Sequence, residues 1–320
     1  MLRWSLHRIA AGVALVWLVA TFTFLLVSLA PGDFATRLTD PRIPPAARAR
    51  WRRDFGLDRP LPLRYASWLG AAVTGDLGSS WIYKQKVVAM LASVLPNTLL
   101  LTSLGLALEL GGGVALAIVQ LRKPHGTGDR IITLATLAAY ALPAFGVALG
   151  LIALLSYRLH LFPPSHMLSL EGEMAHGWPR LVDTARHLVL PVAAIGVTGV
   201  GAVARYLRGS LLDERTEQYV LAARARGCSQ RQALVRHALP NAVLPLITMM
   251  GMSLPFLVSG SLVIEVVFSW PGMGQVMYNA ALGRDLPLVL GGTIVATVAV
   301  VVGNLLADVA YVVADPRVRV

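Results

Sequence analysis

Six long apolar segments constrain this chain more than any other feature of its sequence. A helix needs roughly 20 apolar residues to cross the hydrocarbon core of a membrane, which is about 30 Å thick. The qualifying segments are Ile9–Ala30, Asn97–Leu121, Ile131–Tyr157, Leu188–Leu207, Ala242–Phe268 and Pro287–Ala314. Because helices satisfy their own backbone polar groups in lipid, the sequence predicts an all-α integral membrane protein with about six transmembrane helices.

The composition supports a membrane protein and argues against several other classes. Charged residues make up 14% of the chain, whereas soluble domains contain about 25%. The net charge of +11 would suggest nucleic acid in a soluble protein. Here the arginines flank the apolar segments, where they set topology, so no nucleic-acid partner is expected. The single cysteine, Cys228, excludes an internal disulfide and a cysteine-only metal cluster.

The distribution of Lys and Arg predicts the orientation in the membrane. With the N-terminus in the cytoplasm, the cytoplasmic segments hold fourteen basic residues, and the outer loops 157–186 and 269–286 hold four. The outer segment 31–94 holds ten more, but segments of this length cross the membrane largely regardless of charge. Both termini are therefore expected in the cytoplasm. The first apolar run is too long for the core of a signal peptide, so residues 1–30 are interpreted as a transmembrane helix.

The predicted domain organisation has three parts. Residues 1–30 form the N-terminal helix, residues 31–95 form an extracytoplasmic insert, and residues 96–320 form the core with about five further helices. The insert has helical spacing of apolar residues around Pro45–Phe55. Its composition leaves two interpretations open, a small helical cap on the outer face and a dock for an external protein.

A basic segment between the fourth and fifth apolar runs, within the cytoplasmic loop 208–240, has the signals of two short helices. Thr216 is a candidate N-cap for the first helix. Gly227 stands where a left-handed residue would end that helix. Ser229 and Gln232 form a capping box that would start the second helix, and Pro240 would close it. The paired caps predict a compact knob on the cytoplasmic side.

The first of these short helices also has a face of small apolar residues. Val220, Ala222, Ala223 and Ala225 lie on it. A solvated loop that obeys the positive-inside rule would account for the arginines. It would not account for the apolar face or the caps, which indicate a surface that another protein buries.

This loop resembles the EAA loop of binding-protein-dependent ABC importer permeases. Ala222, Ala223, Gly227, Leu239 and Pro240 match the motif, while Leu221 and His237 replace its Glu and Ile. Those departures, together with Tyr219, Arg224 and Ala225, fit the dipeptide/oligopeptide/nickel branch. The segments Gly56–Leu61, Gly75–Gly78, Phe268–Gly274 and Asp315–Arg317 resemble the same branch, so the resemblance covers essentially the whole chain. It points to the first, B-type, of two permease subunits.

The resemblance implies a type I ABC importer permease fold in the bacterial inner membrane. The implied partners are a second homologous permease, two cytoplasmic ATPases, an extracytoplasmic substrate-binding protein and membrane lipid. ATP and Mg would bind to the ATPases, and this chain would hold no cofactor and no metal and catalyse no reaction; accordingly, its sequence contains no G-x-x-x-x-G-K-[ST] string. By analogy, the contact with the ATPases would be made by Tyr219, Leu221, Ala222, Ala223, Arg224, Arg226, Gly227, His237, Leu239 and Pro240.

Several ionisable residues lie in or near the predicted spans. Such groups are costly in lipid, so they face cavities or partners. Glu109 could bond a neighbouring helix or line the translocation pathway, and Glu265 could line its outer mouth. Asn304 and Asp308, one turn apart on the last predicted span, are expected to lock helices together. The glycines at 111–113 would let helices pack closely.

The function predicted from these features is the permease subunit of an ATP-driven importer of di- or oligopeptides. A permease for nickel or another small solute is an alternative, because the substrate-binding protein usually selects the cargo. A proton-coupled secondary transporter that uses Glu109 as its relay is a second alternative.

Overall fold

The computed structural model describes residues 2–29, 46, 58–243, 246, 253, 256–257 and 262–314. Over these ranges the chain is almost entirely helix and loop, and no strand is present in them. An isolated bridge joins Ser79 to Lys86. The all-α prediction is therefore confirmed.

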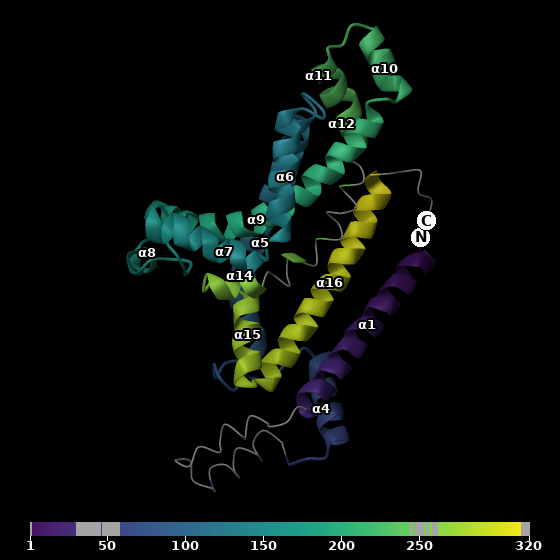
Figure 1. Cartoon of the computed structure of the whole chain (residues 1–320). Helices are drawn as coiled ribbons and strands as arrows, with labels where there is room; N and C mark the ends of the chain where they lie inside the picture. The colour runs from purple at the N-terminus through teal and green to yellow at the C-terminus, as the bar shows by residue number, and fades with distance from the viewer. Residues whose placement is uncertain are drawn as a thin grey trace.

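Four helices of the described residues are long and apolar enough to cross a membrane (Figure 1). They are α1 (Leu2–Leu29), α5 (Val87–Gln120), α9 (Trp178–Glu214) and α16 (Leu286–Ala314). Each overlaps one of the predicted spans. The fifth predicted span, Ala242–Phe268, lies largely outside the described residues. Its two ends appear as the short helices α12 (Leu239–Ala242) and α14 (Leu262–Val267).

The third predicted span is broken in the middle. Helix α6 (Thr127–Ala141) is followed by α7 (Ala144–Leu151) and the π-helix η1 (Ile152–Arg158), and the two halves are bent by 105°. Pro143 explains the break, because proline removes a backbone donor and forces the preceding residue out of the helical region. Leu142 is accordingly extended, with ψ of 138°.

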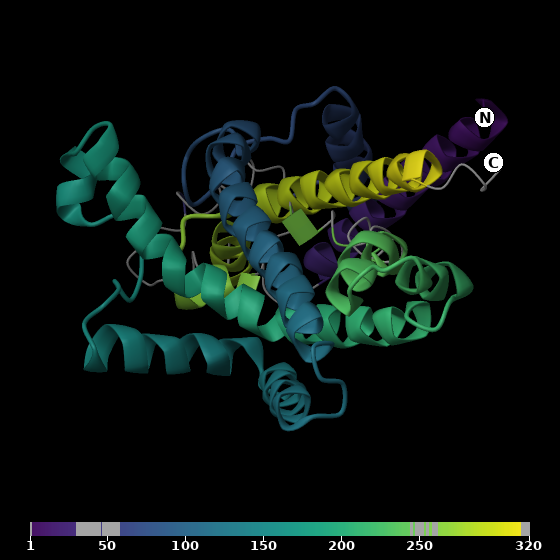
Figure 2. The ribbon, with the colours of Figure 1, turned by 90° about the horizontal axis from the view of Figure 1, so that it is seen from above.

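Helices α5 and α9 form the centre of the bundle and cross at glycines (Figure 2). A Cβ atom on Gly113 would lie 2.5 Å from Val203, and one on Gly112 would lie 2.9 Å from Val200. The close approach predicted for the glycine run is therefore confirmed at these two positions. Gly111 has open space instead, so it contributes nothing to the contact.

Helix α1 packs antiparallel along α16. The Arg8 guanidinium is 2.9 Å from the Asp308 carboxylate near the start of α1 and the end of α16. Further along, a Cβ atom on Gly12 would lie 2.5 Å from Val301. The predicted locking role of Asp308 is confirmed, and the start of α1 and the end of α16 lie on the same side of the bundle (Figure 1).

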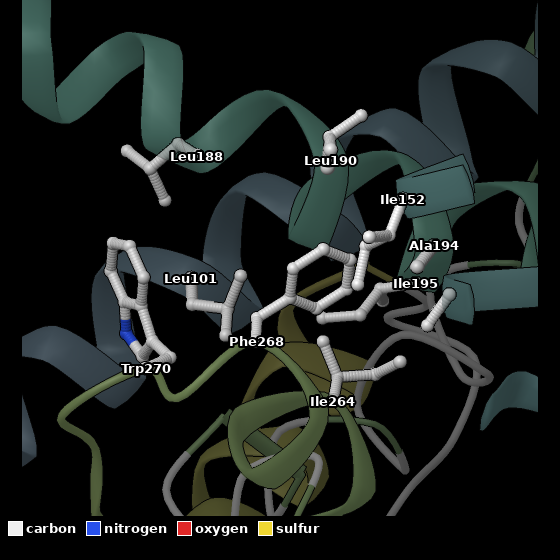
Figure 3. Packing of buried hydrophobic residues seen from close by; sticks show 10 residues of the cluster. Leu101, Ile152, Leu188, Leu190, Ala194, Ile195, Ile264, Phe268 and Trp270 are labelled. Carbon is white, nitrogen blue, oxygen red and sulfur yellow. The ribbon is translucent and has the colours of Figure 1, made fainter. Parts of the chain in front are cut away.

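One apolar core joins the middle of α5 and α9 to α14 and the turn that follows it (Figure 3). Leu101, Leu190, Phe268 and Trp270 are all buried in it. The indole Nε1–H of Trp270 also donates a hydrogen bond to the backbone oxygen of Asn97, at 3.0 Å. Trp270, in the segment Phe268–Gly274, thus fixes the turn that precedes the last helices.

The segments that were predicted to form the outer face differ from the prediction in three places. Residues 269–286, expected to be a loop, contain helix α15 (Met273–Gly283). Helix α5 begins inside the predicted insert at Val87, because its first turns pack against α15 and α16. The outer loop before the fourth span is also shorter than expected, since it holds α8 (Leu170–Met174) and α9 starts at Trp178.

The described part of the insert is helix α4 (Leu61–Val73), which lies against α1. The hydroxyls of Tyr65 and Thr21 are 2.6 Å apart, and the rings of Trp68 and Phe24 stack at 5.3 Å. The helical pattern predicted around Pro45–Phe55 falls outside the described residues.

Candidate functional site

Helix α9 carries the basic loop away from the membrane-crossing part of the bundle. Its 37 residues correspond to about 55 Å, well beyond the roughly 30 Å of the hydrocarbon core. Beyond its end lie α10 (Gln218–Ala225), α11 (Gln230–Ala233), the π-helix η2 (Leu234–Ala238) and α12. Together these elements form a knob at one end of the molecule (Figure 1).

The predicted glycine elbow is present between α10 and α11. Gly227 has φ of +95°, a conformation that other residues adopt only with strain. The backbone N–H of Gly227 donates to the carbonyl oxygen of Arg224 at 3.0 Å, and the backbone N–H of Cys228 donates to the carbonyl oxygen of Ala223 at 3.2 Å. This pair of bonds is a Schellman motif, which satisfies the last carbonyls of α10.

The capping box is confirmed at the start of α11. Ser229 Oγ accepts from the N–H of Gln232 at 3.3 Å, and the Gln232 side chain accepts from the N–H of Ser229 at 2.9 Å. The N-cap predicted for the first helix is wrong by one residue. Glu217 occupies that position, and the Thr216 hydroxyl instead donates to the Asp213 carbonyl, which belongs to the last turn of α9.

Helix α10 divides its small apolar residues between two faces. Val220 and Ala223 are both 1% exposed, and Val220 packs into a core with residues of α5, α9, α11 and η2. Leu221 and Ala222 point away from that core, and Leu221 is 47% exposed. The inner face fixes α10 on the bundle, which leaves a second apolar face open to a partner.

The basic residues of the loop lie on the open side of the knob. Arg224, Arg226 and Gly227 are all exposed. A Cβ atom on Gly227 would meet nothing within 4 Å. The exposed surface of α10 therefore combines small apolar side chains with positive charge.

Tyr219 links α10 to the helices on both sides of it. Its hydroxyl donates a hydrogen bond to the Glu214 carboxylate at the end of α9. The same oxygen accepts from Asn241 Nδ2 in α12, at 2.7 Å. Burial, and after it the bond to Glu214, raises the pKa of the Tyr219 hydroxyl above its ordinary value of 10.0. The hydroxyl therefore stays protonated and able to donate at neutral pH.

The remaining predicted contact residues lie in η2 and α12, the last two elements of the knob. His237 and Leu239 are half-buried, and Pro240 is exposed. Pro240 does not end the second helix as predicted, because the chain stays helical through α12. The π-helix η2 directly precedes α12. In an α-helix the ring of Pro240 would clash with the carbonyl group four residues earlier, and the wider turn of a π-helix lies at that place.

A buried ion pair that the sequence patterns did not reveal lies at the base of the knob. Arg208 of α9 binds Asp129 of α6 with two bonds, Nε to Oδ1 at 2.8 Å and Nη2 to Oδ2 at 2.6 Å. Gln120 Nε2 also donates to Asp129 Oδ1, at 2.9 Å. Three helices are thus tied together less than two turns before α9 ends. Because the partners are far apart in sequence, no local spacing could have predicted this pair.

Glu265 is fully buried in this conformation. One carboxylate oxygen accepts from Thr98 Oγ1 at 3.0 Å, and the other accepts from the N–H of Gln275 at 3.1 Å. Thr98 Oγ1 in turn accepts from the N–H of Met273 at 2.7 Å. These contacts satisfy backbone donors at the start of α15 and anchor that helix to α5. The carboxylate faces helix backbone here.

Glu109 lies on the face of α5 that meets α9, and it is half-buried. Its carboxylate rests on Gly199, where an added Cβ atom would lie within 2.5 Å of all three carboxyl atoms. Within the described part of the chain, no hydrogen bond joins this carboxylate to a neighbouring helix. The two predicted pathway residues are therefore in different environments. Glu265 is buried and both of its carboxylate oxygens accept hydrogen bonds, whereas Glu109 is half-buried between α5 and α9 beside Gly199.

The bundle of membrane-crossing helices and the capped knob at one end define a polytopic membrane protein. The family model "Binding-protein-dependent transport system inner membrane component" matches residues 110–320. The model of the corresponding N-terminal region matches residues 1–102. The chain belongs to this family, the inner-membrane permeases of ABC importers. It is a non-catalytic membrane subunit, and the ATPase activity of such systems resides in other chains.

Relatives of known name match over the whole length. The chain is 33% identical over 320 residues to the oligopeptide transport system permease protein AppB of Bacillus subtilis, with all of both chains covered. It is 31% identical over 321 residues to the glutathione transport system permease protein GsiC of Pectobacterium atrosepticum, with 100% of this chain and 99% of that protein covered. Family membership gives no support to the self-contained, proton-coupled alternative.

Proposed function

We propose that this chain is the B-type permease subunit of an ATP-driven importer of di- or oligopeptides. The observation that carries the coupling role is the two-faced helix α10, which is anchored by Val220 and Ala223 and open at Leu221 and Ala222. The names of relatives that align along the full length, which include an oligopeptide and a glutathione permease, support a peptide as cargo.

The open face of α10 is the docking surface for a cytoplasmic ATPase. Small side chains allow a partner helix or loop to approach closely, and Arg224 and Arg226 offer charge to acidic residues at the rim. The second permease completes the pathway, and a substrate-binding protein delivers the peptide on the opposite face. In this arrangement both termini lie in the cytoplasm, which agrees with the antiparallel packing of α1 on α16.

Three contacts carry motion of α10 into the bundle. Tyr219 joins α10 to α9 through Glu214, and to the start of the fifth predicted span through Asn241. The pair of Asp129 and Arg208 then joins α9 to the broken span. ATP-driven closure of the ATPases shifts the population of permease conformers because it favours one position of α10.

Glu109 is the better of the two candidates for the translocation pathway. It is half-buried beside Gly199, and no hydrogen bond within the described residues fixes its carboxylate. A carboxylate in this setting can meet the ammonium group of a peptide when the seam between α5 and α9 opens. Glu265 is instead a structural residue of the outer face.

The docking surface can be tested by substitution on the open face of α10. Ala222→Trp places a large side chain on an exposed position, so the permease should fold and pair normally. We expect the ATPases to be lost from the purified complex and peptide-stimulated ATP hydrolysis to fall to the unstimulated rate. The control Leu170→Trp alters a residue that is 85% exposed in α8, far from the knob. Normal hydrolysis by Ala222→Trp would refute the docking role.

A further inference from the structure

A cavity with a charged lining lies on the outer face, away from the coupling surface. Its volume is about 350 Å³, and it opens between the end of α1, helix α4 and the start of α16. Phe24, Trp68, Trp81 and Leu290 supply apolar walls, while Arg59 and Arg64 supply positive charge. Neither the proposed coupling mechanism nor the predicted pathway uses this cavity.

The two arginines are available to an anionic ligand. Within the described ranges, neither Arg59 nor Arg64 forms an ion pair with a carboxylate. Asp76 also lines the cavity, and its Oδ1 accepts from the N–H of Gly78 at 3.0 Å, which closes the turn after α4. The cavity therefore keeps a net positive lining. Guanidinium groups bind phosphate with two parallel hydrogen bonds, so they suit this ligand better than ammonium groups do.

An apolar groove continues from this cavity along the same helices. It has a volume of about 500 Å³ and runs between α1 and α16 beneath α4. Ala20 of the groove lies one turn from Phe24 of the cavity, and Ile294 lies one turn from Leu290. A single ligand can thus place a charged end among the arginines and an apolar chain along α1 and α16.

Helix α4 has the features of a helix at the membrane surface. Leu63 is 61% exposed and Val73 is 81% exposed, which is costly in water and favourable at the edge of a bilayer. Trp68 lies on the same helix, and tryptophan is enriched at the level of lipid headgroups. The Tyr65–Thr21 hydrogen bond holds α4 beside the last turns of α1. The arginines therefore stand at headgroup depth.

We propose that the cavity and groove together form a binding site for one phospholipid with an anionic headgroup. The headgroup phosphate binds Arg59 and Arg64, and one acyl chain fills the groove between α1 and α16. A soluble anion would bind the arginines of the cavity and leave the apolar groove unused. A single protein side chain would occupy the cavity or the groove, but not both. The bound lipid would hold the N-terminal helix and α4 in place against the core. This inference is independent of the cargo and of ATP coupling.

Native mass spectrometry of the purified full-length permease tests the site directly. The protein is incubated with equimolar phosphatidylglycerol and phosphatidylcholine, and separately with glycerol phosphate, which has the headgroup chemistry without acyl chains. Wild type should retain phosphatidylglycerol preferentially. Arg59→Gln with Arg64→Gln should lower its retention on the order of tenfold, because two charge-assisted contacts are lost. Arg180→Gln, an exposed arginine in the first turn of α9, is the matched control.

A second variant tests the groove without touching the charges. Val298→Trp fills the groove from a position on α16 that is 43% exposed, so it should reduce retention while leaving the fold intact. Equal lipid retention by wild type, the arginine variant and Val298→Trp would overturn the proposal. Binding of glycerol phosphate as tight as that of the lipid would also overturn it, since it would indicate a soluble-anion site.

Discussion

The hydroxyl oxygen of Tyr219 accepts a hydrogen bond from Asn241 Nδ2 at 2.7 Å, and this bond joins helix α10 to α12, directly before the fifth predicted span. Because the same hydroxyl donates to Glu214, one side chain connects the proposed docking helix to the ends of two others. Under the proposed function, a displacement of α10 by a partner is expected to move both of these helices together. Tyr219 therefore links the proposed docking surface by hydrogen bonds to α9 and α12.

Replacing Tyr219 by Phe removes the link and keeps the ring. The lost hydrogen bonds at this partly exposed site are worth about 1 kcal/mol, which corresponds to about a fivefold change in a coupled equilibrium or rate. We expect peptide-stimulated ATP hydrolysis by the assembled complex to fall by about this factor, with the ATPases still bound. Tyr206→Phe changes an exposed tyrosine of α9 and should have no effect. Unchanged stimulation in Tyr219→Phe would show that the link carries no coupling.

The pH dependence of the same link follows from the raised pKa of Tyr219. Burial and the bond to Glu214 favour the protonated hydroxyl in the folded state. The stabilisation is therefore complete below the ordinary pKa of about 10 and is lost as the pH rises through the higher folded-state value. The difference in thermal midpoint between wild type and Tyr219→Phe should be constant up to about pH 10 and then shrink. A difference that fades at neutral pH would contradict this assignment.

Breaking the pair of Asp129 and Arg208 should be costly. The Asp129 side chain is 3% exposed, and Asp129→Asn leaves the guanidinium without its counter-charge. Removing one partner of a buried ion pair costs about 3 kcal/mol. We expect a matching loss in the free energy of unfolding, measured by denaturation in mixed micelles. Asp213→Asn, at an exposed position on α9, should change it by less than about 0.5 kcal/mol. Equal effects of the two substitutions would mean that the pair contributes nothing.

Two neighbouring glycines of α5 provide a matched test of the central helix contact. Gly113→Ala would press a methyl group onto Val203 and should destabilise the protein by about 2 kcal/mol through overpacking. Gly111→Ala faces open space, and alanine favours helix, so it should stabilise the protein by about 0.5 kcal/mol. The thermal midpoints of the two variants should therefore move in opposite directions. A shared direction would argue against the α5–α9 contact.

The sequence predicts helix class, approximate spans and caps because these depend on local patterns. Hydropathy located α1, α5, α9 and α16, and the S-x-x-Q spacing located the capping box at Ser229. The N-terminal turns of α5 and α9 were missed because they lie outside the apolar windows and form through packing on other helices. Helix α15 was missed for the same reason.

The contact residues were harder to predict than the helices. Small residues at 220–225 indicated an apolar face, but only the packing shows that Val220 and Ala223 turn inward while Leu221 and Ala222 remain open. The partners of Tyr219 and Asp129 come from other helices, so no spacing within the loop could reveal them. The anchoring contacts of Glu265 to Thr98 and Gln275 are tertiary, so the sequence alone could not show them.

Site-directed cross-linking of α10 to the ATPase tests the central claim most directly. Cys228 is the only cysteine, so Cys228→Ser gives a background for single cysteines. Leu221→Cys, on the open face of α10, should cross-link to an ATPase chain in the assembled complex, and the yield should change when ATP is added. Leu170→Cys, which is more exposed but lies in α8, should give no such product. An ATPase cross-link from Leu170→Cys and none from Leu221→Cys would contradict the account.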